Sequence, residues 1–350
     1  MLENKEVEII EKTLTEYSNS NITILGEYAF AYFPSLTSVN LPNCKIVLPS
    51  AFQACSNLIS VDMPKCKTIG TSAFGVCSKL RDVNFPECQY INTQAFTNCT
   101  SLKSVSFPSC EYIGSSAFYG CVNLSIINFP LCKSLGFYAF SACPSLTSIS
   151  FPVCTSIGTG AFSGSPKLTT VDFSACISIG TTAFNNCYGL TTVNFPACTY
   201  IGQSAFSNCS NLTTVSMPVC NRVMAYCFIR CSNLLSANFP MCTYLSAWAF
   251  HHCYKLSIGS FGSGISQNGA YSVTFGQGAF SSCSNLTNLK LYYNCVPSMS
   301  NTNTFDGTPM STSTLTGYFG SIYVPASLVD AYKSAENWSV YADRITALEE

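Results

Sequence analysis

The chain has little charge, almost no histidine and no long apolar run. Charged residues make up 9% of its 350 residues, against about 25% in typical soluble domains, and the net charge is −1. A nearly neutral chain lacks the basic surface that attracts nucleic acid or anionic membranes, so neither is expected as a partner. A run of about 18 apolar residues, which a membrane-spanning helix needs, does not occur.

The sequence is also poor in groups for catalysis or metal binding. His251 and His252 are the only histidines, and no activated nucleophile is signalled beside them. Carboxylates are scattered singly, and the glycine-rich stretch at 259–264 does not join a strand to a helix as phosphate-binding loops do. We therefore expect no enzyme, no cofactor and no metal site. We interpret the two histidines as a solvated pair rather than a metal foothold.

The first 30 residues are polar and acidic. A basic start followed by an apolar stretch, which marks a signal peptide, is not visible there. Three possibilities stay open: the protein remains in the cytoplasm, leaves the cell by another route, or begins here after a removed signal.

What the sequence has in abundance is one 22-residue pattern. Phenylalanine recurs at an unbroken spacing of 22 from Phe30 to Phe250, and then at wider steps at Phe280 and Phe305. The repeating unit reads x-x-C-x-x-L-x-x-V-[NSD]-F-P-x-C-x-x-I-G-x-x-A-F. A period of this length is typical of solenoids, in which one coil buries its apolar side only against its neighbours.

Each part of the unit has a structural interpretation. The L-x-x-V-x-F segment predicts strands at 36–41, 58–63 and every 22 residues up to 234–239. The following proline ends the strand, because it has no N–H to donate. The glycine of the Ile-Gly step suits a left-handed turn.

These features predict a right-handed repeat solenoid with a parallel β-sheet along one face. We assign residues 1–22 to an N-terminal cap, 23–305 to the solenoid and 306–350 to a C-terminal cap. The C-terminal cap is expected to contain a helix at 325–338, with Leu328 and Tyr332 on its apolar side.

The 22 cysteines fall almost completely into two columns with a period of 22. One column runs from Cys44 to Cys242; the other runs from Cys55 to Cys283 and is interrupted by Ser165. Zinc sites use closely spaced pairs, whereas ten residues usually separate the cysteines here. A serine tolerated at one step favours buried thiols that act as small apolar groups over obligatory bridges. Such thiols suit a reducing or anaerobic compartment.

The repeat unit, with its F-P-x-C and I-G-x-x-A-F steps, resembles the BspA-type leucine-rich repeat of bacterial surface proteins. The resemblance covers residues 23 to about 305, and 322–348 is similar to the segment that closes such arrays. It implies a leucine-rich-repeat fold and protein recognition, often adhesion at a cell surface, without catalysis. A cell-surface or secreted location follows from the resemblance, with the cytoplasm as the alternative.

A solenoid offers its partner a long surface, so outward-facing side chains are the candidate binding residues. Small polar residues, among them Asn40, Asp62 and Asn84, form a ladder between the inward valine and phenylalanine. Aromatic residues at outward or variable positions are common in recognition sites. The candidates of this kind are Tyr90, Tyr112, Tyr200, Tyr244, Trp248 and Tyr271. They can equally be ordinary solvent-facing residues that shield neighbouring coils.

The leading functional prediction is a monomeric, non-enzymatic adhesion protein. Its partner is expected to be a host or bacterial surface protein, or a glycan. Two alternatives remain: a structural spacer or phage-fibre-like display component, and a protein that binds or acts on glycans. A protein that acts on glycans as an enzyme would need two carboxylates that face one cleft.

Overall fold

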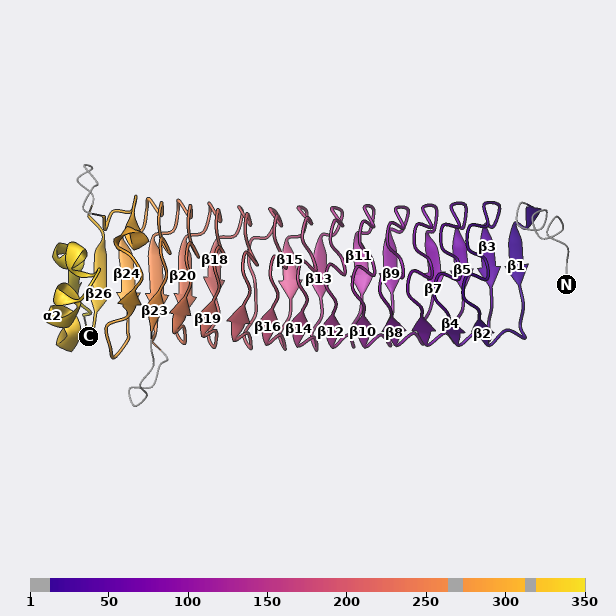
Figure 1. Cartoon of the computed structure of the whole chain (residues 1–350), viewed down its shortest axis with the longest axis horizontal. Helices are drawn as coiled ribbons and strands as arrows, with labels where there is room; N and C mark the ends of the chain where they lie inside the picture. The colour runs from indigo at the N-terminus through magenta and orange to yellow at the C-terminus, as the bar shows by residue number, and fades with distance from the viewer. Residues whose placement is uncertain (1–12, 264–272, 312–318, 350) are drawn as a thin grey trace. The chain divides into compact units, whose positions relative to one another are not determined.

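A computed structural model describes residues 13–263, 273–311 and 319–349. The chain divides into two units, Met1–Leu168 and Thr169–Glu350. Both units are built from short parallel strands that follow one another coil by coil (Figure 1). The predicted repeat solenoid with parallel strands is confirmed.

Each coil of unit 1 contributes two strands, which belong to two separate rows. The first row consists of β1 (Glu16–Ser18), β3 (Ser38–Asn40), β5 (Ser60–Asp62), β7 (Asp82–Asn84), β9 (Ser104–Ser106), β11 (Ile126–Asn128) and β13 (Ser148–Ser150). The second row consists of β2 (Ile24–Leu25), β4 (Ile46–Val47), β6 (Thr68–Ile69), β8 (Tyr90–Ile91), β10 (Tyr112–Ile113), β12 (Ser134–Leu135) and β14 (Ser156–Ile157). The single predicted sheet is therefore accompanied by another at the Ile-Gly step.

Unit 2 repeats this arrangement and ends in short helices. Its first row consists of β15 (Thr170–Asp172), β18 (Thr214–Ser216), β20 (Ser236–Phe239), β22 (Ile258–Phe261), β24 (Asn288–Leu291), β26 (Ser321–Val324) and β27 (Ile345–Ala347). The second row consists of β16 (Ser178–Ile179), β17 (Tyr200–Ile201), β19 (Arg222–Val223), β21 (Tyr244–Leu245), β23 (Thr274–Phe275) and β25 (Ser298–Met299). The helical segments are η1 (Thr302–Phe305), η2 (Ala326–Leu328), α2 (Val329–Ser334) and η3 (Ser339–Arg344).

Strand pairing keeps the sequence period in register. Ser38 pairs with Ser60 and Val39 with Val61, so partners lie 22 residues apart. In β3 and β5 the central valine is buried while the residue that follows it is exposed, as a period of two requires. The strands are shorter than predicted: β3 covers Ser38–Asn40, whereas 36–41 was expected.

Stacked aromatic rings fill the coils. The Ala-Phe column continues from one coil to the next, with ring centroids 5.1 Å apart for Phe52–Phe74 and 5.2 Å for Phe74–Phe96. The Phe-Pro column does the same, with 5.9 Å between Phe85 and Phe107. The columns meet at a tilt, since the planes of Phe74 and Phe85 make an angle of 58°. Offset and tilted ring pairs of this kind each add about 0.5–1.5 kcal/mol beyond area burial.

The cysteines are buried as predicted, with Cys295 half-buried. Thiols of the Cys55 column connect successive coils: Cys55 Sγ–H donates to the Phe30 carbonyl at 2.9 Å and Cys77 to Phe52 at 3.1 Å. Thiols of the Cys44 column bond within their own coil, as Cys44 does to the carbonyl of Ile46 at 3.3 Å. Cysteine therefore supplies a weak donor as well as a suitable size, which the sequence interpretation missed.

The glycine of the Ile-Gly step does not adopt the predicted left-handed conformation. A Cβ placed on Gly136 would lie 2.5 Å from the Ser115 nitrogen of the preceding coil, and one on Gly202 would lie 2.6 Å from the Thr181 nitrogen. The glycine is therefore needed because two backbones approach closely there. The positive φ angles fall two residues later, at positions such as Ser72 (φ 55°) and Trp248 (φ 60°).

The C-terminal segment packs against the last coils of unit 2. Trp338 is fully buried, and its indole N–H donates to the carbonyl of Pro297 at 2.7 Å. Its ring also lies 6.1 Å from Phe305 and 5.0 Å from Tyr332. The predicted helix at 325–338 is shorter in the structure, since α2 ends at Ser334 and Ala335 has an extended backbone.

Replacing Ser165 with cysteine should stabilise the protein. The Ser165 side chain is fully buried in the Cys55 column, and its hydroxyl has no hydrogen-bond partner among the described residues. A C–O bond is shorter than a C–S bond, so the hydroxyl fails to reach an acceptor where a thiol would. Ser165→Cys should raise the free energy of unfolding by about 1–3 kcal/mol in denaturant titration. Cys143→Ser, made in the preceding coil as a control, should lower it; a destabilising Ser165→Cys would contradict this account of the column.

Buried thiols should make the protein sensitive to alkali. Burial raises the pKa of Cys55, Cys66 and Cys110 to about 12. Between the unfolded value of about 8.5 and this range, only the unfolded chain loses protons, so each such thiol removes about 1.4 kcal/mol of stability per pH unit. We expect full stability below about pH 8 and cooperative unfolding, monitored by circular dichroism, as the pH rises above about 9. Unchanged stability at about pH 11 would contradict it.

Candidate functional site

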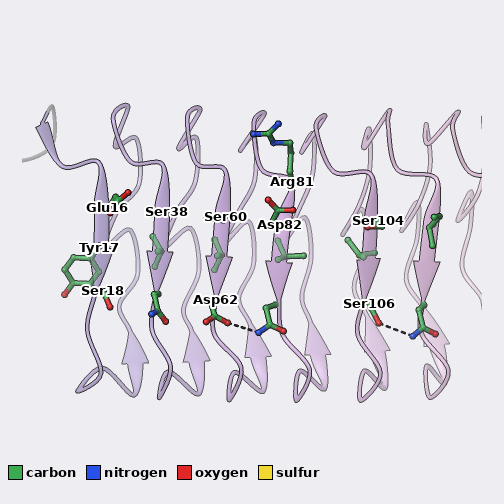
Figure 2. Close-up of a pocket in the computed structure, with 18 residues that line it drawn as sticks. Glu16, Tyr17, Ser18, Ser38, Ser60, Asp62, Arg81, Asp82, Ser104 and Ser106 are labelled. Atoms are coloured by element: carbon green, nitrogen blue, oxygen red, sulfur yellow. Dashed lines mark hydrogen bonds between the residues drawn. The ribbon is translucent and has the colours of Figure 1, made fainter.

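The first row of strands in unit 1 carries a groove on its outer face (Figure 2). Its volume is about 1050 Å³, and its lining comes from six successive coils, from β1 to β11. The walls are mainly small polar side chains, including Ser38, Ser60 and Ser104. A groove that crosses several coils can hold a partner along a line rather than in an enclosed pocket.

The sequence places these side chains outward by simple alternation. In β5 the side chain of Val61 is buried, whereas Asp62 is exposed. Because every coil repeats the same alternation, two parallel lines of polar groups follow from the 22-residue register. The predicted ladder that includes Asn40, Asp62 and Asn84 thus lines the groove. The concavity itself was not predicted, because a repeat pattern gives no measure of sheet curvature.

Neighbouring polar groups within the groove bind one another in pairs (Figure 2). The Asn84 amide donates to a carboxylate oxygen of Asp62 at 2.7 Å, and the Asn128 amide donates to the Ser106 hydroxyl at 3.0 Å. Glu16 and Asp82 add two further carboxylates, and Arg81 adds one cation. The groove therefore offers hydrogen-bonding groups whose positions are already fixed by neighbours.

The tyrosines proposed from sequence lie on the second row of strands. In unit 1, Tyr90 on β8 pairs with Tyr112 on β10, and 45% and 39% of their surfaces are exposed. In unit 2, Tyr200, Arg222 and Tyr244 occupy successive strands, and the Arg222 guanidinium lies 5.3 Å from the Tyr244 ring centroid. The structure thus forms one tyrosine pair and one tyrosine–arginine–tyrosine series.

Trp248 lies in a turn rather than on a strand. A Cβ placed on Gly278 of the next coil would fall 2.4 Å from its indole ring, so the ring lies directly against that glycine. It also meets His251, with ring centroids 4.8 Å apart at an angle of 70°. Trp248 is therefore half-buried and held by its neighbours. Tyr271 lies outside the described residues.

The two histidines are more structured than the predicted solvated pair. His251 is half-buried, and its Nδ1 lies 3.0 Å from the carbonyl of Ser281. His252 Nδ1 lies 3.0 Å from the hydroxyl of Tyr254. Across the described part of the chain, no three histidine, cysteine or acidic side chains are grouped so as to hold a metal ion.

None of the helices in the described residues has the length and apolarity that crossing a bilayer requires.

Comparison with known proteins identifies the repeat. The family described as "BspA type Leucine rich repeat region (6 copies)" matches residues 12–125, 67–178, 133–257 and 265–324. The chain belongs to the BspA-type leucine-rich repeat family. No curated protein matches this BspA-type chain.

Solved structures resemble this BspA-type chain in fold. A leucine-rich repeat protein from Bacteroides ovatus is 20% identical, with a TM-score of 0.50 over 90% of this chain and 88% of that one. A leucine-rich cell surface protein from Faecalibacterium prausnitzii is 24% identical, with a TM-score of 0.47 over 79% of this chain and 87% of that one. At these identities the similarity concerns the fold alone.

The contact between Trp248 and Gly278 can be tested with a matched glycine. Gly278 and Gly307 both have positive φ angles, 61° and 68°, but only Gly278 would bring a Cβ within 3 Å of another side chain. Both alanine variants should lose about 1 kcal/mol from the strained backbone. Gly278→Ala should lose more, and its tryptophan fluorescence should shift as the ring moves.

A double variant isolates the ring contact. In a Trp248→Ala background, Gly278→Ala should cost no more stability than Gly307→Ala does. An equal cost for the two glycines in the native background would show that the ring does not rest on Gly278.

Proposed function

We propose that this BspA-type protein is a non-enzymatic adhesion protein that holds a protein partner along its strand faces. The observation that carries the proposal is the groove of unit 1, where six coils present polar side chains in register. A surface built this way makes many weak contacts, and it can select a partner through their spacing. The family and its likeness to surface proteins support a location at a bacterial surface or outside the cell.

The groove is built for binding rather than for turnover. Asp62 is engaged by the amide of Asn84, and Glu16 and Asp82 lie on other strands, β1 and β7, of the same open face. General acid–base catalysis needs groups positioned around one reacting bond, usually in a site from which water is excluded. The exposed Tyr90–Tyr112 pair adds a second candidate contact on the other row, as do Tyr200 and Tyr244.

Arginine substitutions in the groove provide the test. Ser60 and Ser104 have small side chains that line the groove, so Ser60→Arg and Ser104→Arg should fill it without disturbing the buried valines. Immobilised protein is exposed to host matrix proteins and bacterial surface lysates, and bound proteins are identified by mass spectrometry. A partner bound by the native protein should lose at least about tenfold in affinity for the double variant, which corresponds to about 1.4 kcal/mol.

Ser156→Arg is the matched control, since Ser156 lies on β14 of the second row, two strands away from Tyr112. It should keep the affinity of the native protein. The proposal is wrong if nothing is captured, or if every captured protein binds the double variant and the control equally.

A further inference from the structure

Five side chains form a cationic and aromatic cluster at one edge of unit 2. We call this the edge cluster; it consists of Arg230, Trp248, His251, His252 and Tyr254. Arg230 and His252 occupy the same turn position in successive coils, and both have a φ of 61°. The backbone N–H of Arg230 donates to the backbone carbonyl of His251 at 2.9 Å. The backbone N–H of His252 donates to the backbone carbonyl of Ser281 at 3.1 Å. The backbone therefore fixes the cluster in register.

The rings of the edge cluster are packed against one another. The centroids of His251 and His252 lie 3.7 Å apart, and Tyr254 bonds His252 through its hydroxyl at 3.0 Å. Trp248 rests on Gly278 and meets His251 edge-on. Little side-chain freedom remains to be lost when a partner binds, which favours affinity.

Among the residues that the structure describes, the positive charge of the cluster has no counterion. Arg230 is exposed, and within the described part of the chain no carboxylate forms an ion pair with it. The charge of Arg230 acts on both histidines from the preceding coil, Tyr254 bonds His252 within their own coil, and the Ser281 carbonyl meets them from the following coil. Asp306 is the counterpart of Ser281 one coil further on, where its carbonyl accepts from the backbone N–H of Ser282.

Both imidazoles are held in the neutral form in the unbound protein. Burial lowers the pKa of His251, and the charge of Arg230 lowers it further despite the bond to Ser281. Burial also lowers the pKa of His252, with His251 and Arg230 as additional causes. A carboxylate placed beside Arg230 would reverse this balance, because it stabilises the charged imidazole.

We propose that the edge cluster binds an acidic segment of a partner protein and takes up a proton as it does so. Arg230 receives a carboxylate, the histidines become charged around it, and Trp248 and Tyr254 cover the apolar part of the segment. Tryptophan, tyrosine and arginine are the residues that dominate binding energy at protein interfaces, which favours a protein over other polyanions. The inference rests on the proposed protein-binding function but concerns a surface separate from the groove.

The direction of the pH dependence follows from the charge change. Binding raises the histidine pKa, so affinity should increase as the pH falls from about 7.5 to about 5.5. Isolated glutamate carboxylates of a partner, with an ordinary pKa of about 4.3, remain ionised over this window. In poly-L-glutamate the neighbouring charges raise the carboxylate pKa, so any loss of probe charge at low pH opposes the expected increase in affinity.

The test uses the full chain and poly-L-glutamate as the probe, with affinity measured by calorimetry at low salt. We expect binding to be about tenfold tighter at about pH 5.5 than at about pH 7.5, which corresponds to a mean uptake of about half a proton over the window. His252→Asn should abolish most of this difference, and Arg230→Asn should weaken binding at both pH values. Asparagine tolerates a positive φ, so both variants should remain folded, with unchanged circular dichroism.

Lys333→Asn is the control for net charge, since Lys333 is an exposed cation on α2 of the same unit and lies outside the proposed binding surfaces. It should bind poly-L-glutamate as the native protein does. Equal losses for Lys333→Asn and Arg230→Asn, or a binding constant that does not change with pH, would overturn the proposal. So would binding of polygalacturonate, a carboxylated glycan, that depends on Arg230 and His252 when poly-L-glutamate does not bind.

Different results reject the edge-cluster proposal and the proposal that the groove binds a partner. If Arg230→Asn and His252→Asn alter poly-L-glutamate binding while Ser60→Arg has no effect on any partner, the edge cluster stands and the groove proposal falls. The reverse result removes the edge cluster and leaves the groove.

Discussion

Hydrogen bonds between paired strands, whose partner residues lie 22 positions apart in most coils, hold each coil to the next, and the other features of the fold depend on that register. It places each Ala-Phe ring over the preceding one, with about 5 Å between centroids, and each thiol of the Cys55 column under the carbonyl of the coil before it. It also repeats the alternation that sends valine inward and serine or asparagine outward. A groove over several coils is therefore a product of the same bonds that stabilise the core.

Tight coils impose two distinct backbone demands. At the Ile-Gly step the backbones approach so closely that a Cβ on Gly136 or Gly202 would overlap the preceding coil. Two residues later the chain turns with a positive φ, yet Ser72 and Trp248 occupy that conformation there. Non-glycine residues in the left-handed region cost about 1–2 kcal/mol, which the packing on either side offsets. Such turns bring large side chains to the coil edge, and the edge cluster of unit 2 arises at turns of this kind.

The sequence was sufficient to predict the coil but not its surface. The spacing of Phe30 to Phe250 gave the repeat, and the L-x-x-V-x-F segment gave the first strand row, because both follow from strict periodicity. The second strand row was missed, since a two-residue strand leaves no alternation to detect. The role of the Ile-Gly glycine was wrong because close approach and left-handed turns both favour glycine. His251 and His252 were interpreted as solvated, since only the structure places Arg230 and Ser281 beside them.

The 22-residue register has a consequence for how this gene can change. Each coil contacts only its two neighbours, and successive 22-residue repeats are nearly alike in sequence, as residues 169–187 and 191–209 show. Unequal recombination between such stretches inserts or deletes whole coils. The product keeps every ring stack, thiol bond and strand pair across the junction, so no new interface has to evolve. The length of the binding surface is then a heritable quantity that varies in steps of one coil, independently of the chemistry that each coil presents.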